Sequence, residues 1–323
     1  MKSHLYFKIG LYIFALSASV LAHAQPFPVK PVRLIVPFPA GGATDLVART
    51  IAQKVSDGWK QSVIVENRAG AGGNIGADVV AKAAPDGYSL LINIQGQAIS
   101  ASLYRKLPFD AVKDFTPVVQ ITSSHMILVG HPSMPATLKE VVALGRAQPG
   151  KLNFGSTGLG APPHMAMELF NSVAGLGAVH VPYKGDAPLQ PAMLANEVQL
   201  AFLPVSAAAQ HIKAGKMRAF AVTGAKRGST MPDVSSMVEL GYKELDINGW
   251  IGIFGPGAMP RDLTARIRDE FARATRAPDL LEKWPGWGYE PVAGTPEEFG
   301  AKYRGDIAVF EKIIRDAKVP LVD

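Results

Sequence analysis

The segment PFPAGGATD, Pro37–Asp45, decides the fold of this chain, because it joins an expected strand to an expected helix. The strand is the β-rich run 32–36, and apolar residues recur at every fourth position from Val47 to Val55, which is helical spacing. The same alternation continues with a strand at 62–66, a helix at 75–84 and a strand at 88–94. This βαβαβ order predicts a parallel sheet covered by helices.

A second unit of the same kind begins near Met126. From Ile247 the pattern changes again, with a strand at 250–254 and helices at 263–275 and 296–317. We therefore predict an α/β fold of two lobes, between which the chain crosses twice, near Thr122 and near Ile247. The expected domains are lobe 1 at 25–122 and 247–323, and lobe 2 at 123–246.

The N-terminus has the pattern of an export signal. Two lysines flank the start of the apolar run 9–22, and the small-x-small tripeptide at 22–24 predicts cleavage after Ala24. A transmembrane anchor is the alternative, but the run is shorter than the ~20 residues that a spanning helix needs. We therefore predict that residues 1–24 are a signal peptide and that the mature chain is a soluble periplasmic protein.

The composition excludes several kinds of site. The chain contains no cysteine, which excludes disulfides, thiolate metal sites, cysteine nucleophiles and a lipid anchor on an N-terminal cysteine. The formal net charge of +6 falls by two when the signal lysines are removed, and this mildly basic balance suits an acidic ligand. The charges are too scattered for a nucleic-acid surface. The histidines are spread widely and give no metal-ligand spacing, so we predict neither a metal nor a cofactor.

The turn at 37–45 has the features of an anion-binding site that needs no arginine or lysine. Gly41 and Gly42 let the backbone approach a ligand closely. The free N–H groups at the start of the next helix, together with the helix dipole, attract negative charge. Thr44 can add a hydroxyl or cap the helix. Glycine is also common at such joints for geometric reasons alone, so a purely structural role is the alternative for this segment.

Two turns of the second unit repeat this arrangement. NFGSTGLG, Asn153–Gly160, ends a strand and offers the hydroxyls of Ser156 and Thr157, and His164 begins the next helix. VPYKGDAP, Val181–Pro188, follows the next strand. Turns at the strand ends of two such lobes face a common cleft. A capping or surface role is the alternative for His164.

Enzyme signatures fail at the same turns. The spacing around Ser156 is not that of the G-x-S-x-G nucleophile elbow. The glycine-rich run 70–75 lacks the last glycine of the dinucleotide fingerprint, and the sequence has neither a Walker A loop nor an H-E-x-x-H motif. We expect no catalytic residue, and a periplasmic hydrolase that uses Ser156 or His164 is the rival interpretation.

Five segments resemble the Bug family, the solute-binding components of tripartite tricarboxylate transporters. They are VPFPAGGATD (Val36–Asp45), VENRAGAGGNIGADVVAKAAPDGYSLL (Val65–Leu91), LYRKLPFDAVKDF (Leu103–Phe115), NFGSTGLG (Asn153–Gly160) and VPYKGDAPL (Val181–Leu189). The resemblance implies a type II periplasmic-binding-protein fold, with two lobes joined by a two-crossing hinge. It also implies carboxylate ligands held largely by backbone amides and ordered water.

By position, the resemblance implies ligand contacts in both lobes. In lobe 1 they are Phe38, Ala40, Gly41, Gly42 and Thr44, with Gly96 and Gln97 nearby. In lobe 2 they are Ser156, Thr157, Gly158, His164, Tyr183, Lys184 and Asp186.

Two departures from the family pattern bear on the ligand. Asp186 stands where the family often has glycine, so its carboxylate either repels a ligand carboxylate or pairs with a cationic or hydroxyl group. The tripeptide 203–205 is Leu-Pro-Val, where the family often has an acidic or polar residue that can hold a ligand amine. This second departure disfavours an amino acid ligand.

The predicted function is capture of a small organic carboxylate in the cleft between the lobes for uptake. The expected partners are that carboxylate and the membrane subunits of a tripartite tricarboxylate-type transporter, with no nucleic acid. The protein is expected to be a monomer. A receptor that presents its closed form to a sensor kinase is the alternative, because the resemblance covers both uses.

Overall fold

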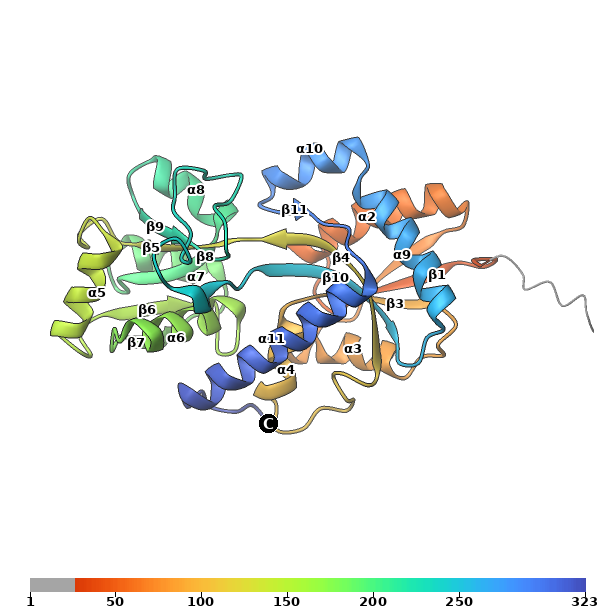
Figure 1. Ribbon diagram of the computed structural model, residues 1–323, viewed down its shortest axis with the longest axis horizontal. Helices are drawn as coiled ribbons and strands as arrows, with labels where there is room; N and C mark the ends of the chain where they lie inside the picture. The colour runs from red at the N-terminus through yellow and green to blue at the C-terminus, as the bar shows by residue number, and fades with distance from the viewer. Residues whose placement is uncertain (1–26) are drawn as a thin grey trace, which may run out of the picture.

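Two sheets, one in each lobe, form the frame of the protein (Figure 1). The computed structural model describes residues 27–323, so the predicted signal peptide and its cleavage site lie outside the described residues. The first sheet has the strand order β11 (Glu290–Pro291), β4 (Phe115–Ser124), β10 (Gly249–Pro256), β3 (Ser89–Ile94), β1 (Val32–Val36) and β2 (Val63–Asn67). Strand β1 runs parallel to β2 and β3, whereas β10 is antiparallel to both β3 and β4.

The second sheet has the same arrangement on a smaller scale. Its strand order is β7 (Val179–Pro182), β6 (Asn153–Ser156), β8 (Leu200–Pro204), β5 (Met126–Gly130) and β9 (Arg218–Val222). Strand β6 is parallel to β7 and β8, and β5 is antiparallel to β8 and β9. In each sheet the first strand that the chain forms after it arrives from the other lobe, β5 or β10, is therefore antiparallel to both of its neighbours.

The chain passes between the lobes through extended backbone. Strand β4 ends at Ser124 and β5 begins at Met126, so only His125 separates the two sheets at the first crossing. The return crossing ends at Gly249, where β10 begins. Figure 1 shows β4 and β10 side by side where they run toward the second lobe, as their antiparallel pairing requires. The lobe boundaries that we place at Thr122 and Ile247 stay a prediction.

Helices cover both faces of the first sheet. On one face, the strands pack against α2 (Ala43–Trp59), α9 (Arg261–Thr275) and α10 (Pro278–Gly286) through side chains such as Ile51 and Phe271. On the other face lie α3 (Asn74–Ala81), α4 (Gly96–Leu103) and α11 (Pro296–Asp316). Successive strand residues point to opposite faces, so Leu34 and Ile35 of β1 enter different cores.

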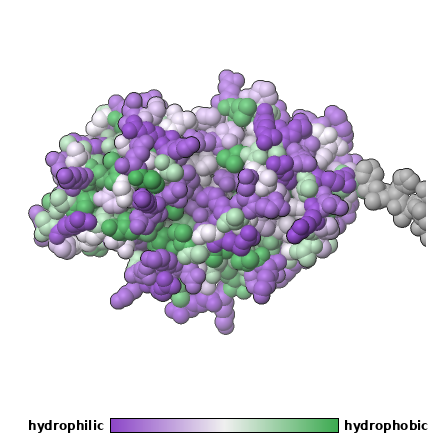
Figure 2. Space-filling view, in the orientation of Figure 1, coloured by the Kyte–Doolittle hydropathy of each residue, from purple (hydrophilic) through white to green (hydrophobic). Residues whose placement is uncertain are grey.

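The second sheet is covered in the same way. One face packs against α5 (Leu138–Ala147) and α6 (Pro162–Ala174), and the other against α7 (Asp186–Leu194) and α8 (Val205–Lys213). Two short 3₁₀ turns, η2 (Ala71–Gly73) and η3 (Lys243–Leu245), complete the described helices. Met165 of α6 packs into the core of the first lobe, so the two lobes touch. On the face drawn in Figure 2, most of the apolar surface lies over the five-stranded lobe and along its boundary with the larger lobe.

Candidate ligand-binding site

Two adjoining cavities lie between the lobes. One has a volume of about 200 Å³ and the other about 180 Å³. Both are lined by Pro204 and Ser206 of the second lobe and by Trp287 and Tyr289, which follow α10 in the first lobe. The residues around the two cavities, all of them described in the structure, include no lysine and no arginine. An anion held here is therefore not paired with a lysine or an arginine of the lining, which leaves main-chain and neutral side-chain donors and His125.

The smaller cavity lies against the hinge. Both crossings contribute to its wall, through residues 124–126 and 249–251. Gln95, at the end of β3, also lines it, and the side-chain amide of Gln95 donates to the backbone oxygen of Asn248 at 3.2 Å. Both segments that connect the lobes therefore form part of the wall of this cavity.

Helix α2 begins at the larger cavity. Ala43 and Leu46, both from its first turn, line the cavity, and no side chain caps the turn. The preceding loop is held from behind by Asp45, which is 1% exposed. Its carboxylate accepts from the N–H of Gly41 at 2.8 Å and from the guanidinium of Arg49 at 2.9 Å. One of the expected donors, the Gly41 N–H, is thus used within the protein, whereas the first turn of α2 lines the cavity with no cap from a described side chain.

The brace at Asp45 is an ionic one. Its second carboxylate oxygen accepts from the Asn67 side chain at 2.9 Å, and that same amide group donates to the backbone oxygen of Phe38. Burial alone would raise the pKa of Asp45, but the hydrogen bonds from Arg49, Gly41 and Asn67 bring it below its ordinary value. The Phe38–Asp45 turn is therefore fixed by a carboxylate that stays ionised at neutral pH.

In the second lobe, two further helices begin at the larger cavity. Asp186 is the first residue of α7 and lines the cavity, after Gly185 with a φ of 98°. Ser206 and Ala207 line it from the first turn of α8. No side chain caps either helix start. The starts of α2, α7 and α8, contributed by both lobes, therefore meet at one cavity.

The start of α6 differs from these three. Its first two positions are Pro162 and Pro163, which have no N–H to donate. Ser156 is 0% exposed and His164 is 1% exposed. The Ser156 hydroxyl accepts from the Gly158 N–H at 3.2 Å, and His164 Nδ1 accepts from the Gly160 N–H at 3.1 Å. These side chains hold the 156–160 loop, and their direct contact with a ligand stays a prediction.

His180 belongs to the same buried network. Its Nε2 lies 2.6 Å from the Ser156 hydroxyl, and its ring stacks on that of His164 with centroids 3.9 Å apart. Burial and the neighbouring His164 lower the pKa of His180 from 6.5 to about 4. A serine beside a histidine is the arrangement that the rival hydrolase interpretation needs. This serine, however, is fully buried, and its hydroxyl is also shared with the backbone of Gly158.

Three possible metal ligands gather around this network. His164, Glu168 and His180 each offer one atom, and these atoms lie within 4.8 Å of one another. Because His164 Nδ1 accepts from Gly160, the ring hydrogen lies on Nε2, the atom that is 3.3 Å from Glu168 Oε1. A metal on Nε2 would force that hydrogen to Nδ1, against the Gly160 N–H. The hydrogen bonds therefore favour a protein brace over a metal site.

The remaining predicted residues surround the cavities less directly. Gln97 is buried and accepts from the side-chain amide of Asn93. Lys184 is exposed, and the half-buried Thr157 accepts at its backbone oxygen from the Gly185 N–H at 3.1 Å. Among the predicted contacts, the structure places Asp186 in the cavity wall, and Gly42, Thr44 and Gly96 are chain neighbours of residues in the two walls. The contacts that we carry over by position stay predictions.

The sequence did not point to Trp287 and Tyr289. They form part of the run WPGWGYEP, 284–291, in which aromatic residues alternate with glycine and proline. Burial raises the pKa of the Tyr289 phenol, which keeps its hydroxyl protonated and able to donate a hydrogen bond. The cluster of aromatic residues beside glycine and proline in this run was a sequence signal for a binding surface. It does not indicate which cavity Trp287 and Tyr289 line.

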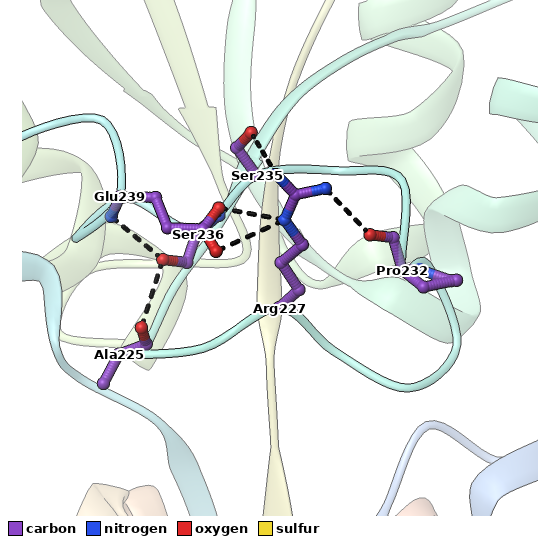
Figure 3. Close-up of polar contacts among 6 residues, drawn as sticks. All are labelled: Ala225, Arg227, Pro232, Ser235, Ser236 and Glu239. Atoms are coloured by element: carbon purple, nitrogen blue, oxygen red, sulfur yellow. Dashed lines mark hydrogen bonds and ion pairs between the residues drawn. The ribbon is translucent and has the colours of Figure 1, made fainter.

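A polar contact joins the lobes beside the smaller cavity. Glu290 of β11 accepts from the backbone N–H of Ser229 at 3.1 Å and from its hydroxyl at 2.9 Å. Ser229 lies in the 223–239 loop of the second lobe, which Arg227 holds in shape (Figure 3). The Arg227 guanidinium donates to Glu239 at 2.9 Å and to the backbone oxygen of Pro232 at 3.1 Å. A preshaped loop thus presents Ser229 to the other lobe.

Comparison with known proteins agrees with this architecture. The sequence pattern of the tripartite tricarboxylate transporter family receptors, TctC, matches residues 47–317. The chain belongs to this family. BugT of Bordetella pertussis is 31% identical over 316 residues, which cover 97% of each chain. The Bug-family resemblance is therefore confirmed.

Solved structures of similar proteins confirm the predicted fold class. A Rhodopseudomonas palustris protein solved with adipate is 30% identical, with a TM-score of 0.77 over 92% of this chain and all of that one. MatC from the same organism, solved with bound malate, is 27% identical, with a TM-score of 0.72 over 89% of this chain and all of MatC. The family is one of periplasmic solute-binding receptors. Within residues 27–323, no helix combines the length and the apolar character that crossing a membrane requires.

Proposed function

We propose that this protein captures a small organic carboxylate between its lobes and delivers it to the membrane subunits of a tripartite tricarboxylate-type transporter. It acts in the periplasm after removal of residues 1–24. The observation that carries the proposal is the meeting of three uncapped helix starts, from both lobes, at one cavity whose described lining includes no lysine or arginine. The family membership supports it, and so do the carboxylates bound by two similar proteins.

The energetics of this arrangement are adequate. A hydrogen bond to a charged group contributes about 1.5–3 kcal/mol, and the field of each helix start adds to it. Three or four such bonds act against the cost of association, and the surplus sets the affinity, for which a micromolar value corresponds to about −8 kcal/mol. Because the donors come from both lobes, a bound carboxylate favours the state in which the lobes are together.

The residues divide into two roles under this proposal. The helix starts at Ala43–Thr44 and at Ser206–Ala207 donate to the ligand, and Trp287 and Tyr289 enclose its apolar part. The other predicted contacts shape the surrounding loops, and these residues are Phe38, Ala40, Gly41, Gly42, Ser156, Thr157, Gly158, His164, Tyr183 and Lys184. No covalent chemistry is required of any of them.

The test removes one main-chain donor and leaves the helix in place. Ala43 is the first residue of α2 after Gly42, whose extended backbone (φ −74°, ψ 168°) is compatible with a following proline. Proline at this position is tolerated and lacks only the N–H. We expect Ala43→Pro to weaken binding of the best carboxylate roughly 10-fold to 100-fold, the loss of one bond to a charged group. Ala43→Gly keeps the donor and serves as the matched control.

The measurement is isothermal titration of a panel of mono- and dicarboxylates that includes adipate and malate. A melting screen with the same panel should show an upward shift with the ligand that binds, because ligand binding stabilises the native state. Unchanged affinity in Ala43→Pro would remove the α2 start from the site. No binding across the whole panel would refute the proposed function.

A further inference from the structure

Among the described residues, Asp186 is the one acidic side chain that lines the larger cavity. It stands at the first position of α7, opposite Ala43 and Leu46 of the other lobe, which line the same cavity of about 200 Å³. Its Oδ1 atom is buried and has no hydrogen-bond partner. Within residues 27–323, no lysine, arginine or histidine forms an ion pair with this carboxylate. Asp186 therefore lines the cavity while one oxygen of its carboxylate, Oδ1, is buried and unsatisfied by the described residues.

An unsatisfied carboxylate in this position is costly. Burial without a partner removes hydration and returns no hydrogen bond, and the raised pKa of Asp186, which burial causes, reports the same imbalance. Its place in the first turn of α7 offsets only part of this cost. By contrast, Asp45 in the first turn of α2 is buried with three donors. A ligand group that donates to Asp186 would supply the hydrogen bond that the carboxylate lacks within the protein.

The walls beside Asp186 favour one kind of donor. Trp287 and Tyr289 line the same cavity, and the faces of aromatic rings attract cations. Their apolar surface excludes water, which strengthens a charge pair formed between them. A cationic nitrogen therefore meets its counter-charge beside aromatic side chains, one of which, Trp287, already has Lys283 Nζ 5.8 Å from its ring centroid. A carboxylate at this end would be repelled by Asp186.

The other end of the cavity has the opposite preference. The uncapped start of α2 places N–H groups and partial positive charge beside Ala43. One cavity is thus lined both by helix starts that attract negative charge, those of α2 and α8, and by the carboxylate of Asp186, which attracts positive charge. Because both ends line a space of about 200 Å³, a single small molecule can reach them together.

We propose that Asp186 is the specificity residue of this site and selects carboxylates that also carry a cationic nitrogen. The proposal rests on the proposed function, since it assumes that the ligand carboxylate binds at the α2 start. It departs from the expectation that Leu203-Pro204-Val205 disfavours an amino acid ligand, and the test below decides between the two. The acidic group absent after β8 is supplied instead by the first residue of α7.

The test uses pairs of acids that differ only in the amino group. Phenylalanine with 3-phenylpropionate, aspartate with succinate, and 4-aminobutyrate with butyrate are titrated into the full mature protein and into Asp186→Asn. We expect the wild type to bind the amino member of its best pair roughly 10-fold to 100-fold more tightly, the value of one charge-assisted hydrogen bond. Asp186→Asn should lose this preference and keep its affinity for the acid without the amino group.

The controls separate the possible outcomes. Asp262→Asn changes an acidic residue in the first turn of α9, away from both cavities, and should leave the preference intact. A wild type that prefers the acids without an amino group, or an Asp186→Asn variant that still prefers the amines, overturns the proposal. Equal binding of malate or 3-phenyllactate and their amino counterparts also overturns it, because a hydroxyl would then suffice. If no acid binds either variant, the proposed function itself has failed.

Discussion

The turns that precede α2 and α6 look alike in sequence, and they differ in the structure. Both follow a parallel strand and carry paired glycines. Before α2 the polar side chain lies behind the turn, at Asp45, and the helix start is left open to the cavity. Before α6 the side chains of Ser156 and His164 take the loop N–H groups, and two prolines remove the next donors. A glycine-rich turn binds anions only when its donors are still free.

The largest expected difference between the two turns lies in their tolerance of a methyl group. Gly160 has a φ of +75°, and a Cβ there would lie 2.1 Å from Leu103 of α4, across the lobe boundary. Gly41 has a φ of +80°, and a Cβ added to it would meet nothing within 4 Å. We expect Gly160→Ala to lower the free energy of unfolding by about 2–4 kcal/mol through strain and overpacking. Gly41→Ala, the matched control, should lower it by about 1–2 kcal/mol through strain alone.

Urea unfolding monitored by circular dichroism measures both variants. Equal losses in Gly160→Ala and Gly41→Ala would mean that the 156–160 loop does not press on the first lobe. The two turns would then differ in their hydrogen bonds alone.

The next largest expected difference between the two turns is the pH at which each loses its contribution to stability. The folded pKa of His180 is about 4 and lies below its ordinary value of 6.5. Between pH 6.5 and pH 4, His180 is therefore protonated in the unfolded chain and neutral in the folded chain. As pH drops through this range, the free energy of unfolding falls by about 2–3 kcal/mol. The Asp45 brace has a lowered pKa, so its contribution is present above 3.8 and is lost only below that pH. The second turn should loosen in a pH range where the first still holds.

Urea unfolding at pH 7 and at pH 4.5 tests this expectation. His180→Phe keeps a ring that can stack on Phe154 and removes the titrating group, so its stability should depend less on pH than that of the wild type. The same dependence in both proteins would show that another group carries the acid sensitivity.

The smallest expected effect concerns the contact between the lobes. Glu290→Ala removes the acceptor of two hydrogen bonds from Ser229 at a partly exposed position. We expect a loss of about 1 kcal/mol in the closed state, which weakens ligand binding roughly 5-fold. The double variant with Ser229→Ala should lose less than the sum of the two single variants, because both remove the same contact. Strict additivity in isothermal titration would show that the pair does not couple the lobes.

Much of the fold was predictable because its signals are local. The strand 32–36 and the turn before α2 were found from β-rich residues, glycines and helical spacing, and β1 has those bounds. The helix expected at 75–84 ends earlier, at Ala81, and Pro85 explains only why it cannot continue past Ala84. Helix α4 and strand β4 were not predicted. Strand β4 contains Pro117 and lacks clean alternation, and α4 follows β3 after a single residue.

The site was harder to predict than the fold. Asp186 was identified because it departs from a family pattern, but its missing hydrogen-bond partner is a property of packing. Trp287 and Tyr289 reach the cavity only because the chain returns to the first lobe and adds β11 beside β4. Ser156 and His164 were predicted as contacts on their chemistry, and nothing local shows that Gly158 and Gly160 occupy their acceptor atoms.

The single residue between β4 and β5 has a mechanical consequence. With His125 alone between two hydrogen-bonded ribbons, very few torsion angles are available to absorb a rotation of one lobe against the other. His125 is itself held at its Nδ1 by the Thr223 carbonyl at 2.7 Å. A short connection of this kind restricts how the lobes can turn against each other, so closing on a solute would order few additional residues at this crossing.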